Sequence, residues 1–302
     1  MNISKNYIAL LFSFVMILSA CTIEPSASVP VGNTTQHIAN TSSGRNNVTV
    51  TFIDVGQGDS TLIQTANGVM LIDGGVRAAY DRIYEILHRE GIYHIDYLVA
   101  THPHADHIGG LVPLIGDNNG IAIGAVIMPD VAHTTRTYEN FLEALIAHNI
   151  HVIEPYPGQI LELDDAVFTI VAPNAVGYSN LNNYSVVMIM DHGNNSFMFT
   201  GDAERESELE ILYHFEEIFA DVLRVGHHGS HTSSTAEFLD AVSPRYAVIS
   251  AGEGNQFGHP HDVVMRRLAD RGIITLITYE LGDIVMISDR NNIEIVANQE
   301  VR

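Results

Sequence analysis

Four side chains of the kinds that bind metal ions lie within six residues of one another: His102, His104, Asp106 and His107, in the run HPHADH. Pro103 holds His102 in an extended conformation, and side chains two apart in an extended segment face the same way. Asp106 and His107 follow where a helix is expected to begin. The pattern predicts a metal site; the alternative is that Asp106 only caps a helix and the histidines beside it occur by chance.

Three other groups of such residues stand at the ends of predicted strands or before a helix. Asp202 follows a strand in the run FTGD, where Gly201 permits close backbone approach, although Gly-Asp is also ordinary turn chemistry. His227 and His228 follow another strand in the run GHHGSHTSS, and His259 precedes a helix in the run GHPH. The histidines interpreted as surface or hydrogen-bonded polar residues are His37, His88, His94, His133, His148, His151, His192 and His214.

The serines after His231 allow two interpretations. Ser234 and Glu237 have the spacing of a capping box, in which case the serines only begin a helix. The N-terminus of the same helix is equally suited to bind an anion.

The elements that must position these residues alternate between strands and helices. Asn67-Gly68 predicts a hairpin, and the loop with Gly56 and Gly58 lacks the third glycine of a dinucleotide fingerprint and continues as strand. Two sheets covered by helices are the economical arrangement. Strands are expected at 48–53, 61–64, 69–72, 96–100, 122–128, 159–163, 166–172, 185–190, 196–200, 222–225, 246–250, 273–277, 283–287 and 293–296, and helices at 79–89, from 107, and at 138–148, 204–213, 235–242 and 262–271.

Composition limits the class of substrate. The chain has 302 residues, of which 46% are hydrophobic, enough for one large α/β domain or two smaller ones. Its 14 basic and 36 acidic residues give a net charge of −22, which opposes the attraction of long polyanions. We therefore expect no strong nucleic-acid-binding surface, whereas short oligonucleotides and small phosphodiesters would be less penalised.

The N-terminus predicts export. Residues 1–20 combine a basic start with an apolar run too short to span a membrane, as in a signal peptide. The run ends LSAC, which resembles the lipobox of bacterial lipoproteins and makes Cys21 the lipidated residue; the alternative is an incidental cysteine near an ordinary cleavage site. Residues 21–47 are then the anchor and a disordered tether, and 48–302 the folded domain. We expect an extracytoplasmic, membrane-anchored lipoprotein.

The metal-type residues together resemble the metallo-β-lactamase superfamily. His102, His104, Asp106 and His107 match its H-x-H-x-D-H motif, Asp202 its bridging aspartate and His227 its late histidine. The resemblance implies a four-layer αβ/βα sandwich, an α/β fold, in which these six residues bind one or two Zn²⁺ ions, with Mn²⁺ as an alternative metal. It also implies that Asp106 and Asp202 are the catalytic carboxylates.

A narrower resemblance is to the hydrolase domain of ComEC-type competence proteins, which take up DNA. It rests on DVGQGDS at 54–60, on HHGS at 227–230 and on N-x-x-GHP at 255–260. The resemblances imply that Asp54 and Asp59 of the first run support the ligands from behind, as does Asp73, which looks like the early aspartate of the superfamily. Unlike ComEC, this chain is expected to be a free-standing, lipid-anchored domain without a membrane channel.

One histidine of a full two-metal site has no counterpart. His192 lies on a hairpin turn, and the strand that returns from it carries it away from Asp202. The residues brought beside Asp202 are instead Asn182, Asn183, Tyr184 and Ser185. Because asparagine is a poorer zinc ligand than histidine, we expect a weaker or exchangeable ion, or a harder one such as Mn²⁺.

The residues and the resemblance together predict a metal-dependent hydrolase in which a metal-bound hydroxide is the nucleophile. The favoured substrate is a phosphodiester, with His228, Ser230, His259 and Asn183 as substrate contacts. Two alternatives stay open: a hydrolase of lactams, lactones or other carboxylic esters and amides, and a metal-binding lipoprotein without catalysis. The sequence identifies no protein partner.

Overall fold

The structure, a computed structural model, describes residues 47–117 and 119–297. The expected signal peptide, the lipidated Cys21 and all of the tether but its last residue lie outside these residues and remain predictions. The first strand begins at Val48. Within the described ranges, no helix has both the length and the apolar character needed to cross a membrane.

The described strands form two mixed sheets. The first has the order β15-β14-β1-β2-β3-β4-β5-β6, parallel from β3 to β6 and antiparallel elsewhere. Its strands are β1 (Val48–Phe52), β2 (Thr61–Gln64), β3 (Val69–Ile72), β4 (His94–Val99), β5 (Ala122–Ile127), β6 (His151–Ile153), β14 (Ile284–Ser288) and β15 (Ile293–Ala297).

The second sheet has the order β13-β12-β11-β10-β9-β8-β7 and is parallel from β10 to β13. Antiparallel pairs join β10 to β9, β9 to β8 and β8 to β7. Its strands are β7 (Ile160–Leu163), β8 (Ala166–Ala172), β9 (Val187–His192), β10 (Asn195–Phe199), β11 (Val222–Arg224), β12 (Tyr246–Ile249) and β13 (Ile274–Ile277).

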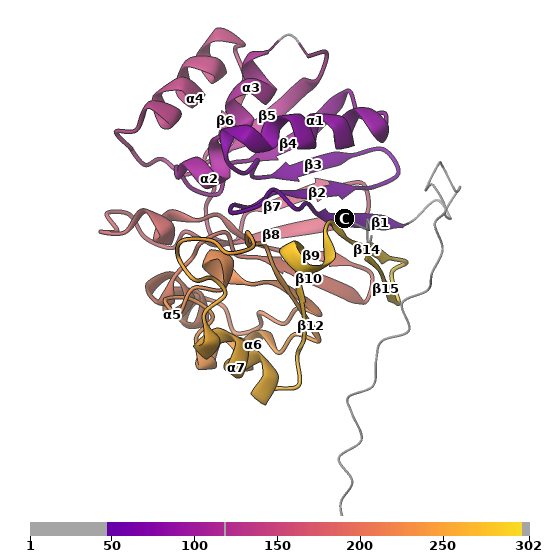
Figure 1. Ribbon diagram of the computed structural model, residues 1–302, viewed down its shortest axis with the longest axis vertical. Helices are drawn as coiled ribbons and strands as arrows, with labels where there is room; N and C mark the ends of the chain where they lie inside the picture. The colour runs from indigo at the N-terminus through magenta and orange to yellow at the C-terminus, as the bar shows by residue number, and fades with distance from the viewer. Residues whose placement is uncertain (1–46, 118, 298–302) are drawn as a thin grey trace, which may run out of the picture. The chain divides into compact units, whose positions relative to one another are not determined.

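Helices cover the outer face of each sheet (Figure 1). The first sheet carries α1 (Tyr80–Arg89), α3 (Leu111–Gly116) and α4 (Arg136–Ala147), and the second carries α5 (Arg205–His214), α6 (Ala236–Val242) and α7 (Asp262–Asp270). This arrangement confirms the predicted αβ/βα sandwich. The shorter elements are α2 (Ala105–Ile108), α8 (Thr278–Leu281) and the 3₁₀ turns η1 (Arg77–Ala79), η2 (Leu181–Tyr184) and η3 (Gly226–Gly229).

Alternation along the strands produces the layers. Ile63 of β2 and Met70 of β3 point into the core between the two sheets. Their neighbours Leu62 and Leu71 point the other way, into a core shared with Ile83 of α1. Because successive strand residues face opposite sides, a strand covered on both faces is apolar at nearly every position. Strand β3 is apolar throughout, and β2 is apolar at its two central positions.

Two sequence predictions differ from the structure. The helix expected from residue 107 is divided into α2 and α3 by Gly109 and Gly110. A Cβ atom at Gly110 would lie 2.1 Å from the carbonyl oxygen of Gly74, so glycine lets the HPHADH segment press against the loop after β3. Strand β6 was not predicted because its three residues are exposed or half-buried and carry no alternation.

The sheets bring their chemically active residues to one edge. Asp73 follows β3 and His102 follows β4 of the first sheet, while Asp202 follows β10, His228 follows β11 and His259 follows β12 of the second. These strands are parallel within each sheet, and ligands in α/β folds bind beyond the carboxyl ends of such strands.

The core between the sheets yields a stability prediction. Phe52 of β1 and Phe199 of β10 are 0% and 2% exposed, and their ring centroids are 6.3 Å apart across the two sheets. We expect Phe52→Ala to lower the free energy of unfolding by about 3–5 kcal/mol, measured by urea denaturation. The control Phe219→Ala, at a ring 54% exposed, should change it by less than about 0.5 kcal/mol. A loss below about 1 kcal/mol for Phe52→Ala would contradict this packing.

Candidate metal centre

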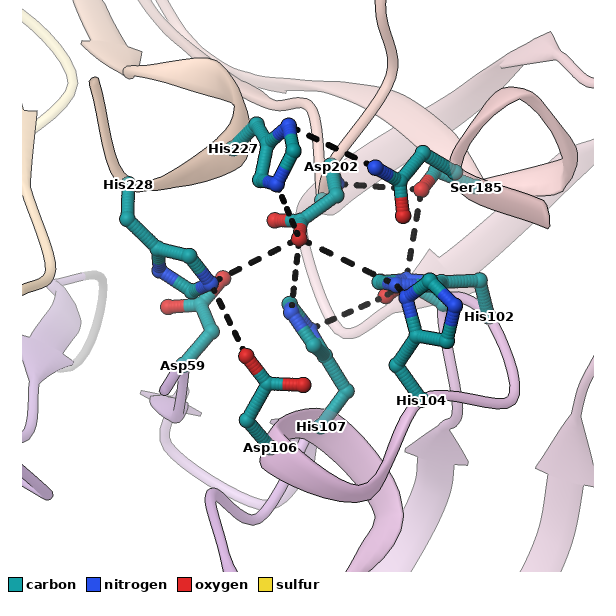
Figure 2. Close-up of polar contacts among 12 residues, drawn as sticks. Asp59, His102, His104, Asp106, His107, Ser185, Asp202, His227 and His228 are labelled. Atoms are coloured by element: carbon teal, nitrogen blue, oxygen red, sulfur yellow. Dashed lines mark hydrogen bonds and ion pairs between the residues drawn. The ribbon is translucent and has the colours of Figure 1, made fainter. Parts of the chain in front are cut away.

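The carboxylate of Asp202 is the point on which the site converges (Figure 2). It is 2% exposed. Its Oδ2 atom lies 3.2 Å from Nε2 of His107 and 3.5 Å from Nε2 of His228. The Nε2 atoms of His102 and His227 are each 3.8 Å from the same oxygen. Four imidazoles, two from each sheet, therefore surround one buried carboxylate.

The HPHADH segment supplies the half of the site that belongs to the first sheet. His102 follows β4 and is buried, and its Nε2 lies 2.9 Å from Nδ1 of His104. His104 has extended backbone and precedes α2. Asp106, in the first turn of α2, places its Oδ2 3.4 Å from Nε2 of His228. The structure thus brings these side chains together, as their spacing predicts.

Asp73 fixes the orientation of His107 from behind. Its Oδ2 lies 2.7 Å from Nδ1 of His107, so Nδ1–H donates and Nε2 faces Asp202. Thr101 donates to Asp73 through its backbone N–H at 2.8 Å and through its hydroxyl at 2.7 Å. Asp73 adopts a left-handed conformation with φ 58°, which aspartate tolerates better than most residues.

Arg224 was not among the site residues predicted from the sequence. It is 1% exposed and forms an ion pair with Asp59, Nε to Oδ2, at 2.7 Å. Its Nη1 lies 3.8 Å from Oδ1 of Asp202 and donates to the carbonyl of Val225 at 3.0 Å. The available signal was an arginine inside an otherwise apolar strand. Its cation offsets two buried carboxylates and ties the loop after β1 to β11.

The structure places His228, predicted to contact substrate, deeper among the ligand-type side chains than His227, which was predicted to bind metal. His228 is 1% exposed, and its Nδ1–H donates to the carbonyl of Ser250 at 2.9 Å, which leaves Nε2 facing the aspartates. His227 is 23% exposed, with Nδ1 3.1 Å from Glu204. The prediction of His227 rested on the family resemblance; in the structure both histidines have left-handed backbone, φ 50° and 54°, and do not continue the alternation of β11. His228 therefore lies among the metal-type side chains, and His227 lies at their rim.

Of the residues expected beside Asp202, Ser185 lies closest to the cluster. Its Oγ accepts the N–H of Asp202 at 3.0 Å and is 3.4 Å from Nδ1 of His102. Asn183, predicted to contact substrate, instead donates its amide to Glu206 at 2.9 Å and accepts from the N–H of Glu204 at 3.1 Å. Both polar ends of this buried side chain are used within the protein.

His192 lies away from the centre, as the hairpin argument predicts. It is fully buried, and its Nδ1 lies 2.8 Å from the hydroxyl of Ser288 on β14.

The other predicted substrate contacts lie on the side of the second sheet. Ser230 is buried, with its hydroxyl 3.0 Å from that of Thr232. The ring of His259 is stacked over that of His228, with centroids 6.2 Å apart. Burial, followed by the nearby histidines, lowers the pKa of His259 to about 4, so this ring is neutral.

Asp54 and His133 lie near the site without being among its ligand-type side chains. Asp54, expected behind the ligands, accepts the N–H of Gly56 at 3.1 Å and so shapes the loop after β1. His133, interpreted as surface or hydrogen-bonded, does bond the carbonyl of Pro103 at 3.2 Å, yet its ring also lies 5.7 Å from that of His104. It borders the site on the side of the first sheet.

The N-terminus of α6 is satisfied by the protein itself. Thr235, not Ser234, is the N-cap, and its hydroxyl accepts the N–H of Phe238 at 3.3 Å. The carboxylate of Glu208 accepts the N–H groups of Ser234 and Thr235. The capping box of Ser234 with Glu237 was wrong, and an internal carboxylate fills the anion position.

Electrostatics in the centre couple the aspartates to the histidines. Burial raises the pKa of Asp202, but His107 and His228 outweigh it and hold this pKa well below its usual range. Burial lowers the pKa of His107, but Asp202 and Asp73 raise it well above its usual value. For His228 burial is again outweighed, first by Asp202, and the pKa is raised to about 9. The pKa of His102 is lowered by burial and by the charge of His107.

Several nitrogen and oxygen atoms of this cluster have no hydrogen-bond partner in the part of the chain that the structure describes and are suited to bind a metal ion. Among the described residues, Nε2 of His107, Nε2 of His228 and Oδ1 of Asp202 are buried without a hydrogen-bond partner. Ligand atoms of His102, His107 and Asp202 lie within 4.8 Å of one another, as do those of Asp106, His107 and His228. Imidazole nitrogens and carboxylate oxygens are the ligands of Zn²⁺ and related ions in hydrolytic sites.

Comparison with known proteins gives relatives among competence proteins of the ComEC type. ComE operon protein 3 of Bacillus subtilis is 33% identical over 253 residues, which cover 78% of this chain and 32% of that protein. Competence protein ComA of Neisseria gonorrhoeae is 34% identical over 237 residues, covering 77% of this chain and 31% of that protein. The chain thus spans about a third of the length of these curated relatives.

Two solved structures share the fold at low sequence identity. The metallo-beta-lactamase fold protein YhfI of Bacillus subtilis aligns with a TM-score of 0.56 and 15% identity, over 80% of this chain and 100% of that one. CmlA of Streptomyces venezuelae, described as a diiron beta-hydroxylase, aligns with a TM-score of 0.52 and 15% identity, over 77% of this chain and 53% of that one. These likenesses concern the fold alone.

The family model for the metallo-beta-lactamase superfamily matches residues 53–253. This range contains the residues described above around Asp202, from Asp59 to His228. The chain belongs to the metallo-beta-lactamase superfamily of metal-dependent hydrolases.

Proposed function

We propose that this protein is a metal-dependent phosphodiesterase that acts on short oligonucleotides or small phosphodiesters. The observation that carries the proposal is the cluster around Asp202, in which one buried carboxylate faces imidazoles from both sheets. The competence-protein relatives support a substrate related to nucleic acid.

The side chains fall into two sets that share Asp202. His102 and His104 with Asp202 would hold one ion, and Asp106, His107 and His228 with Asp202 would hold a second. Such ions lower the pKa of a bound water from 15.7 to about 7 and neutralise charge on a phosphodiester. With Ser185 in place of a further histidine, the set containing His104 would bind the weaker ion. We propose Zn²⁺ for the site, with Mn²⁺ able to replace it.

The surrounding residues prepare the ligands for this chemistry. Asp73 and the carbonyl of Ser250 hold His107 and His228 in the tautomers whose Nε2 atoms face the centre. Arg224 offsets the negative charge of Asp59 and Asp202. Fixed partners of this kind orient metal ligands and tune their basicity.

His227 faces the centre from its rim and is the proposed contact for the substrate phosphate. Glu204 holds its Nδ1 at 3.1 Å, so that Nε2 points toward Asp202. The hydrolysis forms one phosphorus–oxygen bond to the oxygen of water and breaks the bond to the leaving oxygen, which takes up a proton.

The net charge bears on the length of the substrate, and the N-terminal sequence bears on the location of the enzyme. A net charge of −22 disfavours long DNA and favours short substrates. The lipobox resemblance at Cys21 supports an extracytoplasmic enzyme tethered to a membrane by lipid, without a strong nucleic-acid-binding surface.

The first prediction from this proposal concerns activity. The full-length protein loaded with Zn²⁺ or Mn²⁺ should hydrolyse bis(4-nitrophenyl) phosphate and short single-stranded DNA. Asp202→Ala should lower kcat/KM at least about a hundredfold, because it removes the carboxylate shared by both ligand sets.

Asp191→Ala is the matched control. Asp191 is exposed on β9 and pairs with Ser196 near the start of β10, whereas Asp202 follows the end of that strand, so its loss should leave the rate within about twofold. Bound metal without turnover of either phosphodiester would refute the proposal and move the search to lactams, lactones and other carboxylic esters, or to metal binding alone.

The second prediction is that metal binding releases protons. In the metal-free protein the pKa of His228 is raised to about 9. Protonation of this ring therefore adds to the free energy of unfolding; the contribution is complete below pH 6.5 and is lost as the pH rises through 9. A ligand histidine must be neutral, so at pH 7 a bound ion displaces this proton and its affinity rises with pH up to about 9. Calorimetry in buffers of different ionisation enthalpy should show about one proton or more released per ion. An enthalpy independent of the buffer would contradict this.

A further inference from the structure

A series of stacked rings leads from the metal centre to the surface. The ring of His259 is stacked over that of His228, with centroids 6.2 Å apart and planes at 26°. The ring of Phe257 is stacked over that of His259, at 5.6 Å and 24°. His228 is 1% exposed and Phe257 is 52% exposed. The exposed ring of Phe257 is thus separated from His228 by a single ring, that of His259.

The loop that carries Phe257 is held in shape by one side chain. The amide of Asn255 donates to the carbonyls of Gly252 at 2.8 Å and His259 at 2.6 Å. Its Oδ1 accepts the N–H groups of Phe257 at 3.2 Å and His259 at 3.0 Å. Gly258, with φ +71°, permits the turn between the two rings. Because the loop is already ordered, a ligand that binds the Phe257 ring does not have to order it.

An open cleft begins next to this loop. It has a volume of about 480 Å³ and is lined by His231, Gly258, His261, Asp262 and Val263, within the range of about 300–1,000 Å³ usual for small-molecule sites. The rings of His261 and His259 are 4.9 Å apart, so the cleft continues the series of rings.

The charge of the chain decides what such a surface can recognise. With 14 basic and 36 acidic residues, little attraction for the phosphates of a substrate is available away from the metal centre. Stacking on an aromatic ring does not depend on charge and accepts any base. We infer that Phe257 stacks a nucleobase, or a similar planar ring, of the substrate whose phosphodiester lies at the metal centre. The inference rests on the proposed phosphodiesterase function and names the substrate group that it selects.

The test compares two diesters that release the same 4-nitrophenolate: thymidine 5′-(4-nitrophenyl phosphate), which carries a base, and methyl 4-nitrophenyl phosphate, which does not. The metal-loaded full-length enzyme should prefer the nucleoside ester in kcat/KM. Phe257→Ala should reduce this preference about tenfold, mainly through KM, because a base stacked on an aromatic side chain loses binding energy when that side chain is removed.

Matched variants separate stacking from other effects. Phe257→Trp should keep the preference, whereas Phe257→Leu, apolar but not aromatic, should lose most of it. The control Phe219→Ala removes a ring that is 54% exposed, against 52% for Phe257. Phe219 precedes β11 and so lies at the opposite end of that strand from the site. This variant should leave the preference for the nucleoside ester unchanged. If Phe257→Ala and Phe219→Ala prefer the nucleoside ester to the same degree, the inference about Phe257 is overturned while the proposed phosphodiesterase function stands. No hydrolysis of either diester by the wild type would overturn the proposed function, and the inference with it.

Discussion

Burial of the Asp202 carboxylate is the constraint on which the rest of the site depends. A carboxylate taken out of water without partners is strongly disfavoured. Here His107 and His228 compensate it at 3.2 and 3.5 Å, and Arg224 lies 3.8 Å from its other oxygen. Oδ1 of Asp202 and the Nε2 atoms of both histidines are nevertheless left without hydrogen bonds within the described structure. A metal ion is the partner that satisfies these atoms together.

The sandwich makes this convergence possible because each sheet contributes only part of it. The first sheet delivers His102, His104, Asp106 and His107 after β4, and the second delivers Asp202 after β10 and His228 after β11. Their meeting requires close packing between the sheets, which the apolar core around Phe52 and Phe199 provides. The link from Asp59 to Arg224 joins the two halves again beside the ligands.

Local pattern was enough to predict most of the fold and part of the site. Turn residues placed the hairpin of β2 and β3, and the alternation of strands with helices predicted two sheets covered by helices, whereas the αβ/βα sandwich itself was implied by the family resemblance. The positions of His227 and His228 around Asp202 were not predictable in this way, since both residues adopt left-handed backbone. Arg224, and Glu208 at the start of α6, gain their meaning from partners far away in sequence, which no local spacing reveals.

The most direct test of the central claim is to locate the metal. Crystals of the full-length protein grown with Zn²⁺ should give anomalous scattering peaks at the zinc edge beside Asp202. At least one peak should have His107 and His228 as ligands at about 2.0–2.1 Å and a carboxylate oxygen at about 2.0–2.2 Å. A peak bound by His227 with His228 excluded would contradict the assignment of these two histidines. The absence of any peak at Asp202 would contradict the metal centre itself.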